Sequence, residues 1–175
     1  MRTRKRTLAI LLHLCLMFHA SLAYCDVLPE YRLKAVFLYN FIVFTEWPDL
    51  SDTTINLCFD HNHPFGSGID ELNDRKVHQR SIRVLVKSKG EHLRDCQAIF
   101  ISNTEIGRLS EILALLRDQS ILTIADSKDS AEQGVMLNMQ VENEKITFEA
   151  NLIAVRQAGL ILSSRLLRLA TKVIQ

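Results

Sequence analysis

The sequence predicts an α/β domain in which a mostly parallel sheet is covered by helices on both sides. Short apolar segments rich in β-branched residues alternate with segments whose apolar residues recur every three or four positions, which is typical of parallel strands joined by helices. Residues 98–102 form an almost continuous apolar run, as expected for a strand buried on both faces. Two later strand-like segments flank a short polar turn and predict a hairpin.

The first two thirds of the chain predict one long helix followed by alternating strands and helices. Residues 31–47 carry apolar residues at helical spacing, so they predict an amphipathic helix that ends at Pro48. Strands are expected at residues 55–59, 81–86, 98–102 and 121–125, and helices near residues 69–72 and at 104–116.

The last third predicts the hairpin and two helices. Residues 135–141 and 145–150 flank a Glu-Asn-Glu turn and are the expected hairpin strands. Helices are expected at residues 151–158 and 163–173, separated by Gly159, and the second places Leu162, Leu166, Leu169 and Val173 on one apolar stripe. No repeat, low-complexity tract or proline-rich linker occurs, so residues 24–175 are expected to form one domain.

Residues 1–23 are expected to be a signal peptide. Four basic residues open the chain, an apolar run covers residues 8–18, and Ser21 and Ala23 are the small residues that a signal peptidase accepts. The run is too short to span a bilayer comfortably. An acylated lipoprotein cysteine at Cys25 would need a small residue before it, where this chain has Tyr24. We therefore expect a periplasmic protein that is cleaved after Ala23.

The charge and cysteine content of the expected mature chain narrow its partners. It keeps 17 basic and 20 acidic residues and has no basic stretch, so nucleic-acid binding is not expected.

Cys58 lies in one strand-like run and Cys96 directly precedes another. Because adjacent strands could bring them together in an oxidising compartment, we expect a disulfide between Cys58 and Cys96, with Cys25 free or joined to a second copy.

The sequence offers few candidates for chemistry. Asp60, His61 and His63 could bind a metal, but the two histidines are poorly spaced and no third ligand is indicated, so a solvated loop is expected. The Gly-Ser-Gly at residues 66–68 lacks the third glycine of a dinucleotide loop, because Glu71 stands there. No nucleophile motif is present, so no catalytic residue, metal or cofactor is expected.

Glu149 is the one charge that stands out in an apolar context, between Phe148 and Ala150. Strand alternation could simply direct it to solvent. A role in contacts with a partner is the alternative.

Three blocks in constant order cover nearly all of the expected mature chain. They are YRLKAVFLYNF (31–41) with EWP (46–48); Cys58, PFG (64–66) and Cys96 before AIFIS (98–102); and GVM (134–136), ITFEANL (146–152), AGL (158–160) and SSRLLRLA (163–170). Together they resemble the YfiR-like family of periplasmic repressors of membrane diguanylate cyclases.

This resemblance implies a three-layer α/β/α fold, a homodimer and a non-enzymatic regulator. The regulator would bind the periplasmic sensory domain of an inner-membrane diguanylate cyclase and thereby limit cyclic-di-GMP and biofilm formation. An OmpA-like outer-membrane lipoprotein would relieve the repression by sequestering it. The Cys58–Cys96 pair matches a family disulfide, whereas a second family disulfide has no counterpart because no cysteine follows Cys96. Glu149, in the block most similar to the family, is the expected partner-binding residue.

Two other functions remain open. The chain could be a periplasmic small-ligand-binding domain that feeds a membrane sensor such as a histidine kinase, with its ligand at the strand ends. A metal-dependent hydrolase using Asp60, His61 and His63 is less favoured, because a third ligand and a nucleophile are missing.

Overall fold

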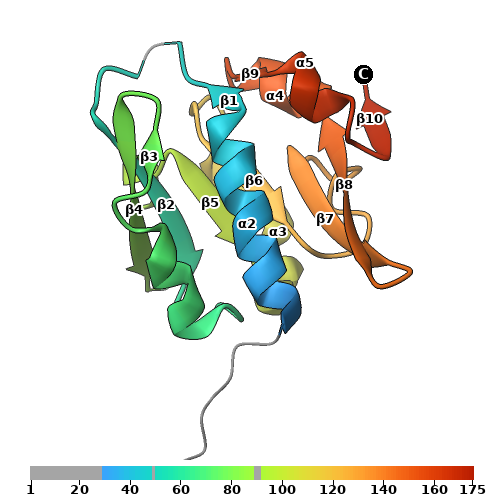
Figure 1. Cartoon of the computed structure of the whole chain (residues 1–175). Helices are drawn as coiled ribbons and strands as arrows, with labels where there is room; N and C mark the ends of the chain where they lie inside the picture. The colour runs from blue at the N-terminus through green and yellow to red at the C-terminus, as the bar shows by residue number, and fades with distance from the viewer. Residues whose placement is uncertain (1–28, 49, 89–91) are drawn as a thin grey trace, which may run out of the picture.

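The computed structural model describes residues 29–48, 50–88 and 92–175 (Figure 1). The expected signal peptide and Cys25 lie outside these ranges. Among the described residues, no helix has both the length and the apolar character that a membrane span requires.

An eight-stranded mixed sheet forms the centre of the fold (Figure 1). Its strand order is β10-β8-β7-β6-β5-β2-β4-β3. Neighbours are parallel except for β7 with β8 and β3 with β4, so the expected mostly parallel sheet with a hairpin is confirmed. The strands are β2 (Thr54–Asp60), β3 (Lys76–Val77), β4 (Arg80–Lys87), β5 (Ala98–Ile101), β6 (Leu122–Ala125), β7 (Leu137–Glu142), β8 (Lys145–Asn151) and β10 (Lys172–Ile174).

Helices cover both faces of the sheet and make the expected three layers. The central strand β5 shows this directly: Ala98 and Phe100 pack in one core cluster, Ile99 and Ile101 in the other, because successive side chains of a strand point to opposite faces. The first cluster holds α2 (Pro29–Val43), the 3-10 helix η1 (Gly66–Leu72), α4 (Leu152–Gln157) and α5 (Ser164–Leu167), and the second holds the 3-10 helix η3 (Asn103–Arg108) and α3 (Leu109–Leu115).

Aromatic rings fill the core between α2 and the sheet. Phe41, Phe65 and Phe100 are at most 1% exposed. Edge-to-face contacts join Phe41 to Phe148 at 5.0 Å and Phe65 to Phe100 at 4.9 Å between ring centroids, a geometry that adds to the free energy of burial. The Phe41–Phe148 contact joins α2 to β8, and α2 lies over the middle of the sheet (Figure 1).

The connections that follow β2 and β5 leave the sheet on opposite faces. The crossover from β2 to β4 runs through η1 on the face of α2, whereas the crossover from β5 to β6 runs through η3 and α3 on the other face. β2 and β5 are parallel neighbours. Neighbouring parallel strands with diverging connections leave a crevice at their carboxyl ends, so the fold places a crevice after Asp60 and Ile101.

The helix expected at residues 163–173 is wrong. α5 ends at Leu167, and β10 follows and pairs in parallel with β8. Backbone N–H and Oγ1 of Thr171 both donate to the Phe148 carbonyl, at 2.9 and 3.0 Å. The β-branched residues at 171 and 173–174 favour a strand, and the pairing satisfies the open edge of β8. Leu169, expected on the buried stripe, is 70% exposed.

Two other expected helices have different bounds. The helix expected at 31–47 ends at Val43, because Thr45–Glu46 form the short strand β1, which pairs with β9 (Ile161–Leu162). The segment expected at 104–116 begins as the 3-10 helix η3 and becomes α-helical only at Leu109.

Candidate functional site

A cleft of about 560 Å³ lies at the carboxyl ends of β2, β4 and β5, on the α3 side of the sheet. This is the crevice that the diverging connections create, and its size is ordinary for a small-molecule site. Ile99 and Ile101 line it from β5, and Ile112, Leu115 and Leu116 line it from α3. Leu115 is 58% exposed, so the apolar lining reaches the mouth of the cleft.

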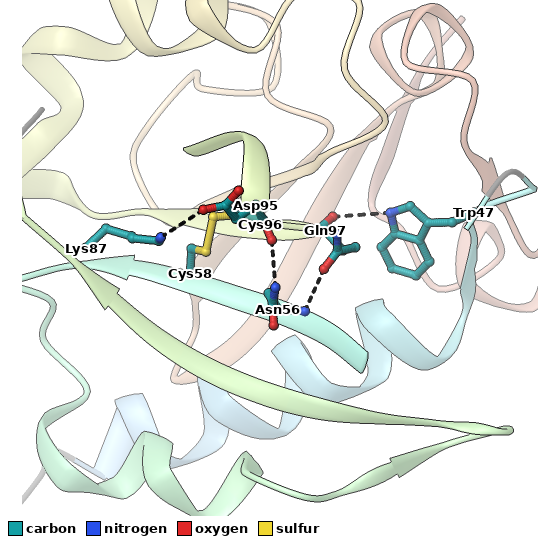
Figure 2. The surroundings of a disulfide bond; sticks show 7 residues. All are labelled: Trp47, Asn56, Cys58, Lys87, Asp95, Cys96 and Gln97. Atoms are coloured by element: carbon teal, nitrogen blue, oxygen red, sulfur yellow. Dashed lines mark hydrogen bonds and ion pairs between the residues drawn. A yellow bond between two sulfur atoms is a disulfide. The ribbon is translucent and has the colours of Figure 1, made fainter. Parts of the chain in front are cut away.

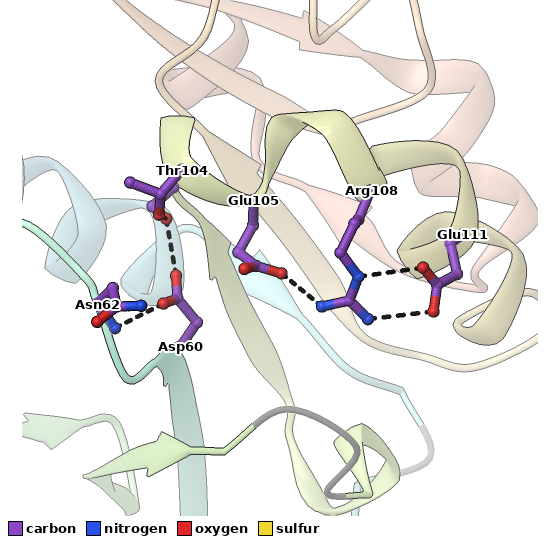
Figure 3. A network of polar contacts seen from close by, with 7 residues as sticks. Asp60, Asn62, Thr104, Glu105, Arg108 and Glu111 are labelled. Atoms are coloured by element: carbon purple, nitrogen blue, oxygen red, sulfur yellow. Dashed lines mark hydrogen bonds and ion pairs between the residues drawn. The ribbon is translucent and has the colours of Figure 1, made fainter.

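Arg108 organises the α3 wall of the cleft. Its Nε and Nη2 donate to the two carboxylate oxygens of Glu111, each at 3.1 Å, and its Nη1 donates to Glu105 at 2.6 Å (Figure 3). Hydrogen bonding to Glu111 first, and then to Glu105, raises the pKa of Arg108 above its ordinary value. Both carboxylates are therefore occupied by a cation on their own wall.

Asp60 joins the ends of β2 and β5. Ser102 Oγ donates to its Oδ2 at 2.7 Å. The backbone N–H of Asn62 donates to its Oδ1 at 2.6 Å, and Figure 3 shows Asn62 beside Asp60. Ser102 Oγ also lies 2.7 Å from Thr104 Oγ1. The Asp60 carboxylate thus serves as an acceptor for the loops that start at both strands.

The structure separates the two histidines of the metal hypothesis. His61 lines the cleft, whereas the His63 ring packs against Phe59 and Phe65 at 5.1 and 6.2 Å between centroids. Burial lowers the pKa of His63, although the charges of Asp60 and Asp70 oppose this. In the described ranges, no group of three His, Cys, Asp or Glu side chains is placed to hold a metal ion.

A disulfide fixes the opposite wall of the cleft. Cys58 in β2 and Cys96 before β5 are bonded, with their Cα atoms 5.9 Å apart (Figure 2), which fits the pairing expected from the sequence. Both residues are buried. The bond holds the short 3-10 helix η2 (Leu93–Asp95) against β2, and Asn56 Nδ2 supports the same turn by donating to the Asp95 carbonyl at 2.7 Å.

A buried ion pair at the carboxyl end of β6 was missed by the sequence analysis. Lys34 Nζ donates to Asp126 Oδ2 at 2.6 Å, and the Tyr31 hydroxyl donates to the same oxygen at 3.0 Å. The Lys34 and Asp126 side chains are 4% and 2% exposed. Burial alone would lower the pKa of Lys34, but hydrogen bonds to Asp126 and Glu30 outweigh it, and the pKa is raised.

One signal for this pair was present in the sequence. Lys34 lies four and eight residues before Leu38 and Ile42, both of which are fully buried. A cation on the apolar stripe of a helix needs a buried counter-ion, so a partner could have been anticipated. Nothing in the sequence pattern identifies Asp126 as that partner.

Glu149 lies on β8, half-buried, on the side of the sheet opposite Phe148. Asn138 Nδ2, directly across on β7, donates to its Oε2 at 3.4 Å. Lys172 of β10 lies opposite Glu149 in register but forms its ion pair with Glu132. The hydrogen bond to Glu132 is the main reason that the pKa of Lys172 is raised, and Glu149 adds to it. Glu149 therefore belongs to a polar, largely acidic surface.

A family model described as YfiR/HmsC-like matches residues 31–171. The chain belongs to the YfiR/HmsC-like family. The resemblance seen in the sequence is thereby confirmed. Members of this family are periplasmic regulators.

The remaining comparisons concern the fold alone. A conserved domain protein from Vibrio cholerae matches with a TM-score of 0.57 at 11% identity, over 81% of this chain and 60% of that one. The ABC domain from Streptococcus pneumonia, solved in complex with L-Trp, matches with a TM-score of 0.48 at 10% identity, over 70% of this chain and 55% of that one. This chain therefore spans 60% or less of the length of either structure. No curated protein matches the sequence.

Proposed function

We propose that this YfiR/HmsC-like protein represses an inner-membrane diguanylate cyclase by binding the periplasmic sensory domain of that enzyme. The observation that carries the proposal is the family match, which extends over residues 31–171. The proposal includes export with cleavage after Ala23, a homodimer, and release of repression by an OmpA-like outer-membrane lipoprotein. Its output is a lower level of cyclic-di-GMP and less biofilm.

The polar face of β7, β8 and β10 is the proposed contact surface. Glu149, Glu132 and Asp129 lie around the cation Lys172 there, so this part of the surface is suited to a partner that presents basic groups. Charged contacts at an interface set specificity and association rate, and a reversed charge at a central position can abolish binding. Because Glu149 is half-buried and contacts Asn138, its carboxylate is held in one place before the partner arrives.

The test compares a deletion strain with two charge reversals. Deleting the gene is expected to raise cyclic-di-GMP, and Glu149→Arg is expected to reproduce most of that rise while the protein still folds and is exported. Glu71→Arg is the matched control, because Glu71 is an exposed carboxylate of η1, on the α2 face of the sheet and away from the polar face of β7, β8 and β10. It should leave cyclic-di-GMP at the wild-type level.

The outcomes separate the role from the site. Unchanged cyclic-di-GMP in the deletion strain, with the neighbouring cyclase intact, would reject the repressor role. A normal phenotype for Glu149→Arg, alongside a clear effect of the deletion, would reject only the contact surface. Binding of the purified protein to the cyclase's isolated periplasmic domain, measured for the wild type and both variants, checks that the effect acts through contact.

A further inference from the structure

The lining of the cleft at the ends of β2, β4 and β5 carries three cations, Lys87, Arg94 and Arg108, and three carboxylates, Asp60, Glu105 and Glu111. Its three carboxylates are already engaged: Asp60 accepts from Ser102 and from the Asn62 backbone, and Glu105 and Glu111 share Arg108. Lys87 and Arg94 line the facing wall. Arg94 forms no ion pair with the described part of the chain. The neutral donors leave the negative charge of Asp60 in place, and Asp60 lies in register with Lys87. The hydrogen-bond donors that remain for an anionic ligand are therefore those of Lys87 and Arg94.

Lys87 is the stronger of these two groups. Its side chain is only 17% exposed, yet its ion pair is with Asp95, which lies 3.6 Å away and is itself 68% exposed. A largely desolvated ammonium group is stabilised by a close anion. A solvent-exposed carboxylate at this distance stabilises it only weakly. An anionic group bound in the cleft would give the Lys87 ammonium group a second counter-ion.

The floor of the cleft determines the chemistry of the rest of the ligand. Ile99, Ile101 and Ile112 form an apolar surface that continues to the exposed Leu115 at the mouth. Pockets of this kind bury an apolar body and orient it through a few polar groups. The size of about 560 Å³ accommodates a ligand larger than a single ion or an acetate-sized molecule.

We infer that this cleft binds a small amphipathic carboxylate, with its carboxylate on Lys87 and its apolar body on the isoleucine floor between β5 and α3. Binding itself does not depend on the proposed function. Only its biological meaning, as a small-molecule input to the regulator, rests on that function.

Three probes with one apolar body and different head groups test the inference: octanoate, octan-1-ol and octylamine. Titration of the full mature protein, followed by calorimetry and by amide NMR shifts, should give saturable 1:1 binding of octanoate with a Kd below about 1 mM. Octan-1-ol should bind at least about fivefold more weakly and octylamine should not saturate. The shifted amides should include those of Ile99 and Ile112.

Two variants separate the head group from the body. Lys87→Met keeps the aliphatic stem and should weaken octanoate about tenfold while changing octan-1-ol less than about twofold. Leu115→Gln, at an exposed position that the fold tolerates, should weaken both probes about threefold. Lys145→Met, on an exposed lysine of the distant hairpin, is the charge-matched control and should change neither.

Several results would overturn the inference. These are octan-1-ol or octylamine binding as tightly as octanoate, an octanoate affinity unchanged by Lys87→Met, or no saturable binding of any probe. Because no partner protein is present in the titration, these results leave the repressor role untouched. Conversely, unchanged cyclic-di-GMP in the deletion strain leaves a positive titration standing.

Discussion

The sheet is built differently at its two sides: β2, β4 and β5 are parallel strands joined by crossovers, whereas β7 and β8 form an antiparallel hairpin. Parallel strands bring all their carboxyl ends to one edge, so the loops that follow them converge around a crevice. A hairpin instead spreads every second residue over one open face. The first arrangement yields the cleft, and the second yields the polar face around Glu149, where we propose the contact with another protein.

Helix α3 and the loop after β6 connect these two regions. Ile112 and Leu115 of α3 line the cleft, while Leu113 of the same helix lies against Gly134, where a Cβ would meet its Cδ1 at 3.3 Å. The same loop contacts the hairpin through Asn151 Nδ2, which donates to the Ala131 carbonyl at 2.8 Å. Helix α3 thus packs against both regions, and a side chain at Gly134 would be strained by the φ of +112° and would press on Leu113.

Removing the disulfide, which lies on the cleft side, has the largest expected effect. The bond closes a loop with a sequence separation of 38, for which the chain-entropy model gives about 4 kcal/mol of stabilisation. We expect the double variant Cys58→Ala/Cys96→Ala to lose about that much free energy of unfolding in urea titrations.

The same variant sharpens the comparison between the two regions. Its octanoate affinity should fall, because η2 loses its covalent link to β2, while its contact with the cyclase domain should persist wherever the protein remains folded. A loss of stability below about 1 kcal/mol would contradict the expectation, since native disulfides commonly contribute 2–5 kcal/mol.

The Lys34–Asp126 pair gives the next largest effect, and an exposed pair at the other side is its control. Among the described residues, Lys34→Met leaves the buried Asp126 with the Tyr31 hydroxyl as its hydrogen-bond donor, so we expect a loss of about 3 kcal/mol in unfolding free energy. Replacing both partners, as Lys34→Met/Asp126→Leu, should recover most of it. Lys172→Met removes a solvent-exposed pair with Glu132 and should change stability little. Equal losses for Lys34→Met and Lys172→Met would show that burial does not set the strength of these pairs.

The sequence predicts the central layers of this fold better than its edges. The strands β5 and β6 are buried at every position and are apolar except for Thr123, and such runs can be recognised without any tertiary information. The strands β1, β9 and β10 have two or three residues each. Strands this short show no recognisable alternation of apolar and polar residues. They form because a neighbouring strand edge offers hydrogen bonds. For this reason the sequence alone predicts a continuation of helix α5 through β10.

The candidate site likewise has parts that the sequence predicts and parts that it does not. Cys58 and Cys96 could be paired from their strand positions, and Glu149 could be singled out because it interrupts an apolar run. The cleft could not be located, since Lys87, Arg108 and Ile112 meet only after β2 and β5 become neighbours and their connections diverge. Asp126 is equally unreadable, because its partner lies 92 positions earlier in the chain.

The smallest expected effect is a pH dependence that comes from His63, on the α2 side of the β2 end. Its folded-state pKa is lowered by burial, so below the ordinary histidine pKa of about 6.5 the unfolded chain binds a proton that the folded chain resists. Stability is therefore fully present above that pH and is lost as the pH falls through the lowered value. We expect the urea midpoint of the wild type to fall between pH 7.5 and about 5.5 more than that of His63→Gln.

His61→Gln, two residues away in the lining of the cleft, is the matched control and should follow the wild type. If His63→Gln loses as much stability on acidification as the wild type does, the acid sensitivity of this region originates elsewhere.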